Sequence, residues 1–513
     1  MSHPCILAHD LGTTGNKATL FDAVTGAVVA SVFEAYGTAY PRPNLAEQDP
    51  ADWRRALCLG TQRLLAQAAA LPTAVMPGDI AVVSFSGTMN GALAVDADGV
   101  PLRSAILWAD QRATAEAELM ADRCGEVQVY RTTGTRITPS CSAAKFLWIQ
   151  RHQPEVYDRT HLFLQVKDYA AFLLTGVLAS DYSDASNTNL FDLEARTWAT
   201  DLVAASKLDP AKLPPLFPST AVIGYVTPQA AALTGLLAGT PVVIGGGDGA
   251  CATVGAGAVH PGDAYINIGS SAWLAVTARR PLYDPEMRTF NLAHLDPKLV
   301  MALGSMQAAG GAFDWLERLL RGAAQAHLHD MLSADAASVP PGANGLLFLP
   351  YLLGERSPYW NPLARGAFVG LTMTHGRPEM ARAVLEGVAF NLRMILDAFR
   401  AQQSSLGQGS GITALRLIGG GARSPLWRQI LADMFGMPIL LPELVTEATS
   451  LGAAIAGGVG VGIFADFTVT DRFIRTAVAA QPEPAAQARY AQLAPLFQAA
   501  YRGLEPIFGQ LRG

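Results

Sequence analysis

Two short β-hairpin patterns of the same kind lie in opposite halves of the chain, and each turns through glycine and hydroxyl side chains. In the first, residues 5–10 predict a strand, residues 11–15 a tight turn and residues 17–22 the return strand. In the second, residues 264–268 and 272–277 predict two strands around a Gly-Ser-Ser turn. Because a repeated supersecondary unit indicates repeated domains, this pattern predicts two homologous domains that face each other.

Longer helical patterns alternate with the predicted strands, which favours α/β layers over a bundle or a sandwich. These helices are expected over residues 50–67, 313–321, 379–400 and 426–435. The glycine-rich run 250–262 is the expected hinge, so we divide the chain into domains 1–254 and 255–513. Residues 402–411 predict a loop, and the Ala/Pro-rich segment 477–487 is expected to lead into a last helix that ends near Phe508.

The composition excludes several classes of protein. Of the 513 residues, 50% are hydrophobic and 16% charged, which excludes a disordered chain. The formal charge of −6 argues against nucleic-acid binding, because no basic excess is present to neutralise phosphates. Five widely spaced cysteines without a CxxC pair predict neither a disulfide framework nor a zinc site. Without a signal-peptide or membrane-span pattern, the expected location is the cytoplasm, away from any membrane.

The first candidate site is the turn Asp10-Leu11-Gly12-Thr13-Thr14-Gly15. Glycines allow backbone to approach a phosphate, and Thr hydroxyls with backbone N–H groups donate to its oxygens. The Asp10 carboxylate could hold the Mg²⁺ that a nucleotide brings. An ordinary hairpin turn would use the same residues, so that alternative stays open. No GxxxxGK[ST] or strand-linked GxGxxG occurs, which excludes a P-loop and a Rossmann fingerprint.

The second candidate is an apolar strand, residues 241–244, that runs into three glycines and then Asp248. Ligands of open α/β sheets bind where strands end, and a carboxylate there could accept a hydroxyl proton. The alternative is an Asp that only caps a helix.

The third candidate is the run 415–424, which passes from a strand through Gly419, Gly420 and Gly421 to Ser424 at an expected helix start. Its glycines would let a base or ribose lie on the backbone, and the helix N-terminus would face the same site. Residues 447–454 downstream carry small side chains at helical spacing, which indicates close packing more than chemistry. The one close histidine pair, His327 and His329, is interpreted as solvated surface and not as a metal site.

The order of these motifs resembles that of the FGGY carbohydrate kinases, members of the actin-like ATPase superfamily. Residues 140–152 fit the family's N-terminal signature, and residues 366–371 with 379–386 fit its C-terminal one. The similarity runs from about residue 5 to about residue 465. It implies two ribonuclease-H-like α/β domains around a central cleft. Four segments are similar to the subgroup that phosphorylates D-xylulose: residues 46–50, 180–186, 349–358 and 418–429.

The resemblance implies an ATP-dependent sugar kinase that uses Mg²⁺. Asp248 would be the catalytic base and Asp10 the metal ligand. The residues implied in ATP binding are Thr13, Thr14, Lys17, Gly269, Ser270, Gly310, Gly311, Asp314, Gly420, Gly421 and Ser424. Those implied beside the sugar, with Asp248, are Met89, Asn90, Trp108 and Asp110. Trp108 could equally be a core residue. Many members of the family are dimers, so a homodimer is expected.

Two departures from the subgroup fall in the expected sugar site. The chain has Thr88-Met89-Asn90 where the subgroup has Gln-Met-His, and Gly249 where Asn or Gln usually follows the catalytic Asp. Asparagine keeps a donor and an acceptor but is shorter than histidine and cannot become charged. Another ketose, a polyol or a sugar acid is therefore an alternative substrate. An ATP-binding switch protein without sugar chemistry is a second alternative, against which Asp248 and both signatures argue.

Overall fold

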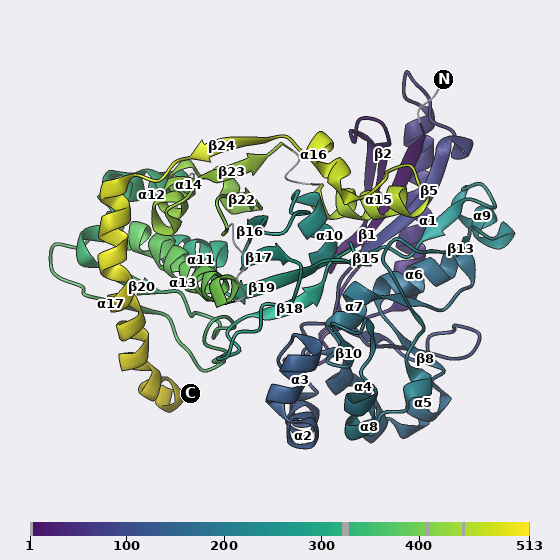
Figure 1. Ribbon diagram of the computed structural model, residues 1–513, viewed down its shortest axis with the longest axis horizontal. Helices are drawn as coiled ribbons and strands as arrows, with labels where there is room; N and C mark the ends of the chain where they lie inside the picture. The colour runs from purple at the N-terminus through teal and green to yellow at the C-terminus, as the bar shows by residue number, and fades with distance from the viewer. Residues whose placement is uncertain (1–3, 321–327, 406–410, 444–446, 512–513) are drawn as a thin grey trace.

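The computed structural model describes residues 4–320, 328–405, 411–443 and 447–511. Within these ranges the chain forms two α/β units, each built on a seven-stranded sheet (Figure 1). The unit made from the N-terminal half lies on the right of the view and the unit made from the C-terminal half on the left. The two-domain α/β fold that the repeated hairpins predict is confirmed.

The first sheet has the strand order β13-β14-β5-β1-β2-β3, with β15 also paired to β5. Strands β1, β2 and β3 form an antiparallel meander, β1 runs parallel to β5, β5 parallel to β14, and β13 is antiparallel to β14. The strands are β1 Cys5–Leu11, β2 Gly15–Asp22, β3 Val28–Ala35, β5 Ile80–Gly87, β13 Val222–Tyr225, β14 Pro241–Val243 and β15 Gly246–Gly247.

The second sheet repeats this topology. Its order is β18-β19-β17-β16-β22-β23-β24, in which the β19-β17-β16 meander is antiparallel, β16 and β22 are parallel, β22 and β23 are parallel, and β24 is antiparallel. The same sequence of pairings in both sheets identifies an internal duplication. The strands are β16 Ala264–Ile268, β17 Ala272–Ala278, β18 Phe290–Ala293, β19 Val300–Met306, β22 Leu415–Ile418, β23 Ile439–Pro442 and β24 Thr476–Ala480.

Helices cover the sheets and fill the remaining lobes. On the first sheet they are α1 Pro50–Ala69, α6 Val166–Thr175 and α9 Pro228–Thr234. On the second they are α11 Gly310–Leu320, α12 Leu328–Ser338, α13 Arg377–Ser405, α14 Pro425–Phe435 and α17 Pro484–Phe508, with α16 Thr470–Phe473 and the short strands β20 Leu347–Leu349 and β21 Ala367–Val369 nearby.

A separate lobe is inserted between β5 and β13 (Figure 1). Its helices are α2 Thr114–Cys124, α3 Glu126–Thr133, α4 Ser142–His152, α5 Pro154–Arg159, α7 Tyr182–Ser186 and α8 Thr200–Ser206. Its short strands are β6 Leu93–Val95, β7 Ala105–Ile106, β8 Leu162–Leu164, β9 Ser180–Asp181, β10 Phe191–Asp192, β11 Thr197–Trp198 and β12 Leu216–Phe217. Strand β4 Glu47–Gln48, from before the lobe, pairs with β7.

Two helices join the sheets at the centre of the molecule: α10 Asp248–Gly255 and α15 Ala448–Gly460. A Cβ at Gly255 would overlap the carbonyl oxygen of Ala448, and one at Gly452 would overlap that of Cys251, so the two backbones are in direct contact. The small residues of 447–454 are therefore packing residues, as predicted. One buried cluster takes side chains from both sheets and both helices, among them Ile6, Tyr265, Val254 and Leu451.

Three expectations about local structure differ from the structure. The glycine-rich run expected as a hinge begins within α10, where residues 250–255 are buried in a helix. Residues 402–405 extend α13 instead of forming a loop, and residues 406–410 lie outside the described residues. Segment 477–487 contains most of β24, which the sequence did not predict because an edge strand of Ala and Val gains its order from pairing with β23.

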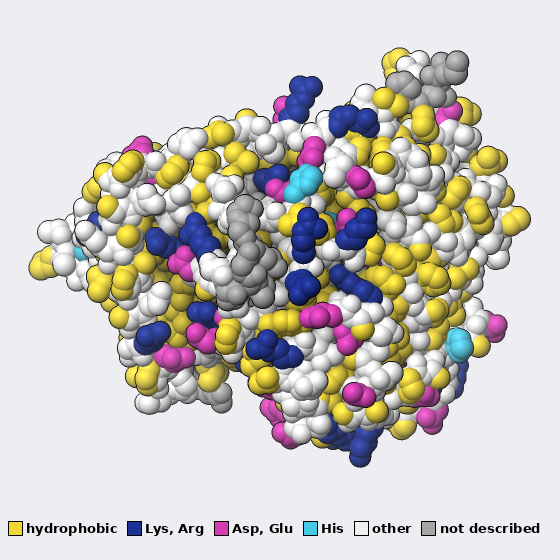
Figure 2. Space-filling model, viewed as in Figure 1, with side chains coloured by type: hydrophobic (Ala, Val, Ile, Leu, Met, Phe, Trp, Pro, Cys, Tyr) yellow, Lys and Arg dark blue, Asp and Glu magenta, His cyan; other side chains and the backbone are white. Residues whose placement is uncertain are grey.

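Three further observations bear on the composition arguments. None of the five cysteines, all in described parts of the chain, forms a disulfide. Among the helices of the described ranges, none has the length and hydropathy that a membrane crossing needs. Basic and acidic side chains are interspersed over the face in Figure 2 instead of separating into regions of one sign. His327, one of the two close histidines, lies outside the described residues.

Candidate active site

The two predicted carboxylates lie at the same edge of the first sheet, on either side of β5. Asp10 of β1 pairs with Ser86 in parallel register, and Gly246 of β15 pairs with the same Ser86 from the other side. Asp248 then begins α10, with Gly247 in the capping position. Because neighbouring strands lie about 4.8 Å apart, this register brings the two acids across one strand from each other.

Burial and mutual repulsion control the protonation of this pair. Burial, together with the negative charge of Asp10, raises the pKa of Asp248 to about 7, although a hydrogen bond from the Gly249 N–H opposes the rise. Burial also raises the pKa of Asp10, against the effects of the Ser86 hydroxyl and the Lys17 ammonium. Two carboxylates with raised pKa values at a strand edge can accept a proton and a cation.

The turn of residues 11–15 is held in place by hydrogen bonds, while its threonine side chains remain at least partly exposed. Its backbone closes through a hydrogen bond from Gly12 N to Gly15 O of 3.0 Å, and Gln48 Nε2 donates to the Thr13 carbonyl at 2.7 Å. Thr14 is exposed, whereas Lys17 on β2 forms an ion pair with Glu447 with a Nζ–Oε1 distance of 3.4 Å.

The predicted nucleotide residues of the second sheet gather at the carboxyl ends of β16 and β22. Gly310 N donates to Gly269 O at 2.9 Å, and Gly311 N donates to Ser270 O at 3.0 Å, so the hairpin turn and the start of α11 are joined backbone to backbone. A Cβ at Gly421 would lie 2.7 Å from Ile268 Cγ2, which keeps that loop against β16.

The remaining nucleotide candidates lie on helices beside this junction. The Ser424 hydroxyl accepts the backbone N–H of Trp427 at 3.2 Å and so caps α14, as predicted. Gly420 is in the short 3₁₀ turn that precedes this cap. Asp314 is exposed on the first turns of α11.

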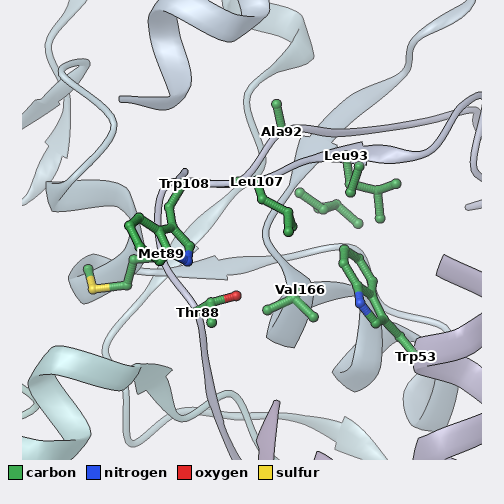
Figure 3. Close-up of a pocket in the computed structure, with 11 residues that line it drawn as sticks. Trp53, Thr88, Met89, Ala92, Leu93, Leu107, Trp108 and Val166 are labelled. Atoms are coloured by element: carbon green, nitrogen blue, oxygen red, sulfur yellow. The ribbon is translucent and has the colours of Figure 1, made fainter. Parts of the chain in front are cut away.

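Of the predicted sugar-side residues Met89, Asn90 and Trp108, Met89 contacts the turn that carries Asp248. A Cβ at Gly247 would lie 2.6 Å from Met89 Cγ, so the Met89 side chain rests on the residue before Asp248. Figure 3 shows Met89 and Trp108 at one end of a small cavity of about 10 Å³, with Trp53 at the other end. Trp108 is 39% exposed and its Nε1 donates to Thr13 Oγ1 at 3.2 Å, which excludes the core alternative.

Asn90 has an unusual conformation and an unsatisfied oxygen. Its φ is +65°, in the left-handed region, and its buried Oδ1 has no hydrogen-bond partner among the described residues. Lys145 Nζ donates to the Asn90 carbonyl at 2.5 Å and to the Ser140 carbonyl at 2.6 Å, which holds this conformation. Asn90 therefore offers an acceptor that a ligand hydroxyl can satisfy.

Asp110 is placed differently from its sugar-side neighbours. Its side chain is fully buried, one oxygen accepts the Ala46 N–H at 2.6 Å, and Arg112 donates to both oxygens. Although burial alone would raise the pKa of Asp110, the hydrogen bonds from Arg112 and Ala46 hold it below the ordinary value. Both oxygens are thus in use within the protein, and Asp110 anchors the segment that carries Trp108.

A larger cavity, of about 480 Å³, lies away from these residues. Its lining includes Arg54 and Cys58 of α1, Tyr169 of α6 and Leu233 of α9. The loop before β7 also contributes to it. None of the predicted site residues lines it.

Family models match both halves of the chain. The FGGY family of carbohydrate kinases, N-terminal domain, matches residues 5–255, and the C-terminal domain of that family matches residues 264–461. The chain belongs to the FGGY family of carbohydrate kinases. It is therefore a sugar kinase, a phosphotransferase with a sugar and ATP as substrates.

Proteins similar to this FGGY kinase include both xylulose kinases and gluconokinases. A xylulose kinase of Staphylococcus epidermidis is 36% identical over 90% of this chain and 88% of its own. A gluconokinase of Bacillus licheniformis is 32% identical over 96% of this chain and 94% of its own. The crystal structure of ligand-bound xylulose kinase from Lactobacillus acidophilus is 28% identical, with a TM-score of 0.90 over 99% of this chain and 100% of that one.

Sequence reasoning missed the residues that support the site from behind. Lys145 lies in the N-terminal signature, but its contact with Asn90 needs the fold to be seen. The available signal was a lysine within the apolar run Ala143-Ala144-Lys145-Phe146-Leu147, since a buried lysine needs partners. The pairing of Lys17 with Glu447 left no signal, because more than half of the chain separates the two residues.

Proposed function

We propose that this FGGY kinase transfers the γ-phosphate of ATP to a hydroxyl of a small ketose, with D-xylulose as the first candidate. One observation carries the proposal: Asp10 and Asp248 flank β5 at one sheet edge, and burial with mutual repulsion raises the pKa of Asp248 to about 7. The substrate class is supported by the xylulose kinases among the relatives and by the motifs shared with them.

In the proposed reaction the substrate hydroxyl oxygen forms a bond to the γ-phosphorus while the bond to the bridging oxygen of ADP breaks. Asp248 accepts the hydroxyl proton. Phosphoryl transfer depends mainly on positioning and charge stabilisation, so a base with a pKa near 7 suffices. Thr13 and Thr14 on one sheet, with Gly269 and Ser270 on the other, would hold the phosphates between them.

The donor set at Asp10 fits a magnesium ion. A single carboxylate oxygen at a strand edge is the hard ligand that Mg²⁺ takes together with phosphates and waters. Within the described ranges, no three acidic, histidine or cysteine side chains form a protein cage for a metal. When bound, the ion would neutralise charge on the phosphates, while Asp10 holds it at the edge of β1.

The sugar would lie against Met89, Asn90 and Trp108. The unsatisfied Asn90 Oδ1 would accept a sugar hydroxyl, and the Trp108 ring would cover the carbon face. Because Trp108 also donates to Thr13, the sugar wall and the phosphate turn would move as one piece.

A sugar acid is the second candidate substrate. The gluconokinase relative and the change from histidine to Asn90 support it. A panel of ketoses, polyols and aldonic acids with purified protein separates the two candidates by kcat/KM. Asn90→His should shift preference toward D-xylulose if the pocket has diverged from it, and an unchanged profile contradicts that account.

The base is tested with Asp248→Asn, which should retain ATP binding and lose sugar phosphorylation by several orders of magnitude. Asp122→Asn, on the exposed side of α2, removes one charge elsewhere and should leave turnover unchanged. Near-normal turnover of Asp248→Asn refutes the base assignment. Sugar-stimulated ADP release by the unaltered protein distinguishes the kinase from a non-catalytic ATP switch.

We also propose that domains 1–254 and 255–513 close around ATP, because candidate phosphate contacts come from both sheets. Closure would exclude water and limit wasteful hydrolysis. A cytoplasmic location fits the need for ATP and five cysteines without a disulfide. A homodimer is expected from the family and is tested by light scattering.

A further inference from the structure

A buried ionic cluster is connected to residues 246–248, the turn that carries the proposed base and is called the catalytic turn below. Lys167, near the start of α6, has its Nζ 2.6 Å from Asp168 Oδ1, 2.9 Å from Asp181 Oδ1 and 3.1 Å from Asp184 Oδ2. All four side chains are completely buried. Burying charges in this way is costly, so a cluster of this kind calls for an explanation beyond stability.

The cluster contains more acid than base, and Asp184 accommodates the excess. Burial, with Asp168 and Asp181 close by, raises the pKa of Asp184 well above its ordinary value, against the attraction of Lys167. This shift favours the protonated form of Asp184. Asp181 is held by hydrogen bonds: its two oxygens accept from Ser183, Ser219 and the Asp184 N–H.

A chain of hydrogen bonds connects this cluster to the residue before the base. The Ser183 hydroxyl donates to Asp181 Oδ2 at 2.6 Å. The same Ser183 oxygen accepts the backbone N–H of Gly247 at 2.8 Å. A serine hydroxyl has a single proton to donate, and Ser183 donates it in the hydrogen bond to Asp181. Ser183 Oγ therefore acts only as an acceptor toward the Gly247 N–H. The orientation of this hydroxyl is thus fixed by the cluster.

The peptide between Gly246 and Asp248 has little room to move. A Cβ at Gly246 would lie 2.7 Å from Ser183 Oγ, and one at Gly247 would lie 2.6 Å from Met89 Cγ. Lys167 also packs under β5, where a Cβ at Gly87 would lie 3.0 Å from its own Cβ. The catalytic turn therefore contacts the cluster at Gly246 and Met89 at Gly247.

We propose that Ser183, oriented by Asp181 and Lys167, is a positioning residue that holds the Gly247 peptide and thereby aims the Asp248 carboxylate at the sugar hydroxyl. The proposal rests on the proposed role of Asp248 as base. A misplacement of about 1 Å of a catalytic group can cost about a hundredfold in rate, so one hydrogen bond at this peptide is enough to matter.

The test is Ser183→Ala, compared with Ser186→Ala as a matched control. Ser186 is an equally buried serine of the same helix, and its hydroxyl also accepts a backbone N–H, that of Ala293 at 3.1 Å. The Ser186 hydroxyl donates to the Ser183 backbone carbonyl at 2.7 Å, and the N–H that it accepts belongs to β18, so it makes no hydrogen bond to the Gly247 peptide. We expect Ser183→Ala to lower kcat about ten- to a hundredfold, with KM for sugar and for ATP within about twofold. Ser186→Ala should keep kcat within about twofold while losing similar thermal stability.

A further variant keeps the proposal falsifiable if Ser183→Ala fails to fold. Ser219→Ala removes only the second hydroxyl that donates to Asp181 Oδ2, at 2.7 Å, and should lower kcat a few-fold without changing KM. Equal kcat losses in Ser183→Ala and Ser186→Ala overturn the proposal. So does an unaffected kcat in Ser219→Ala when Ser183→Ala is unfolded.

Asp248→Asn measured in the same assay separates this proposal from the assignment of the base. If Asp248→Asn keeps its turnover, the base assignment fails whatever the serine variants do. If Asp248→Asn is inactive and the two serine variants behave alike, the base stands and the positioning role of Ser183 is wrong.

Discussion

Lys17 and Glu447 form an ion pair that joins the two halves of the chain, with 3.4 Å between Nζ and Oε1. Lys17 lies on β2, beside the turn predicted to bind phosphate, and Glu447 immediately precedes α15. Lys17 is 31% exposed and Glu447 18%, so the pair contributes little to stability by itself. The position of the pair is what matters for function, because the Lys17 ammonium, a candidate phosphate ligand, is already paired with the Glu447 carboxylate.

Replacing Lys17 tests whether it contacts ATP phosphates. We expect Lys17→Met to raise KM for ATP about tenfold, because a phosphate contact with a charged group is worth about 1.5–3 kcal/mol. KM for the sugar should change by less than twofold. Steady-state kinetics with each substrate varied in turn gives both values.

Glu447→Gln provides the control for this prediction. It removes the ion pair but keeps the Lys17 charge, so it should leave KM for ATP unchanged or lower it. A rise in KM equal to that of Lys17→Met would mean that Lys17 acts only through Glu447 and contacts no phosphate.

Lys145 supplies a second prediction, about the sugar side of the site. Burial lowers the pKa of Lys145 to about 7, yet its Nζ donates to the carbonyls of Asn90 and Ser140. Lys145→Met would leave both carbonyls without that donor, at a cost of about 1–3 kcal/mol each. We expect a lower melting temperature and KM for the sugar raised about tenfold, with KM for ATP nearly constant. Lys298→Met, at an exposed position, is the control. A loss of stability with both KM values unchanged would show that Lys145 does not position Asn90.

Much of the fold could be predicted because its signals are local. The strands β1, β2, β16 and β17 have alternating or continuous apolar residues that end in glycine turns, and the structure places them within about two residues of the prediction. The edge strand β24 has no such signal, because Thr476–Ala480 is mostly small and exposed and is ordered by pairing with β23. Helix α10 also escaped prediction, because glycines that usually break helices are required there for contact with α15.

The candidate site divides in the same way. Asp10 lies near the end of β1, and Asp248 and Ser270 lie within two residues of the ends of β15 and β16, so a motif along the chain indicates all three as candidates. The residues that hold the site in place come from separate segments: Ser183 from the inserted lobe reaches Gly247, and Lys145 reaches Asn90. Asp110 is predicted beside the sugar from its place in a motif, and the structure adds that its oxygens accept hydrogen bonds from Arg112 and Ala46. Contacts between distant segments become visible only once the chain is folded.

The contact between α10 and α15 yields a prediction about stability. A methyl group at Gly255 would overlap the Ala448 carbonyl, and backbone cannot move aside as a side chain can. We expect Gly255→Ala to lower the free energy of unfolding by about 3 kcal/mol or more, because overpacking of a rigid contact is costly. Gly503→Ala, on α17 with open space around it, should instead be neutral or stabilise by up to about 1 kcal/mol. Urea denaturation of both variants measures the difference. Equal free energies of unfolding for Gly255→Ala and Gly503→Ala would contradict the close contact between α10 and α15.

The last prediction concerns the acid stability of the fold and depends on His294, at the end of β18. Its Nδ1 accepts the Asp296 N–H at 2.9 Å, so the ring proton is on Nε2, which lies 3.3 Å from the Ala258 carbonyl. Burial lowers the pKa of His294 from its ordinary 6.5 to about 4, although Asp296 opposes this. At a pH between these two pKa values, His294 is protonated in the unfolded chain and neutral in the folded chain. The free energy of unfolding is therefore unaffected by His294 above pH 6.5 and falls as the pH drops from 6.5 to 4, by about 3 kcal/mol in total.

His294→Gln keeps a side chain that can donate and accept but does not titrate. Its melting temperature should be lower at pH 8 yet fall less steeply toward pH 4 than that of the unaltered protein. Parallel curves for the two proteins over this range would mean that His294 is not a source of acid sensitivity.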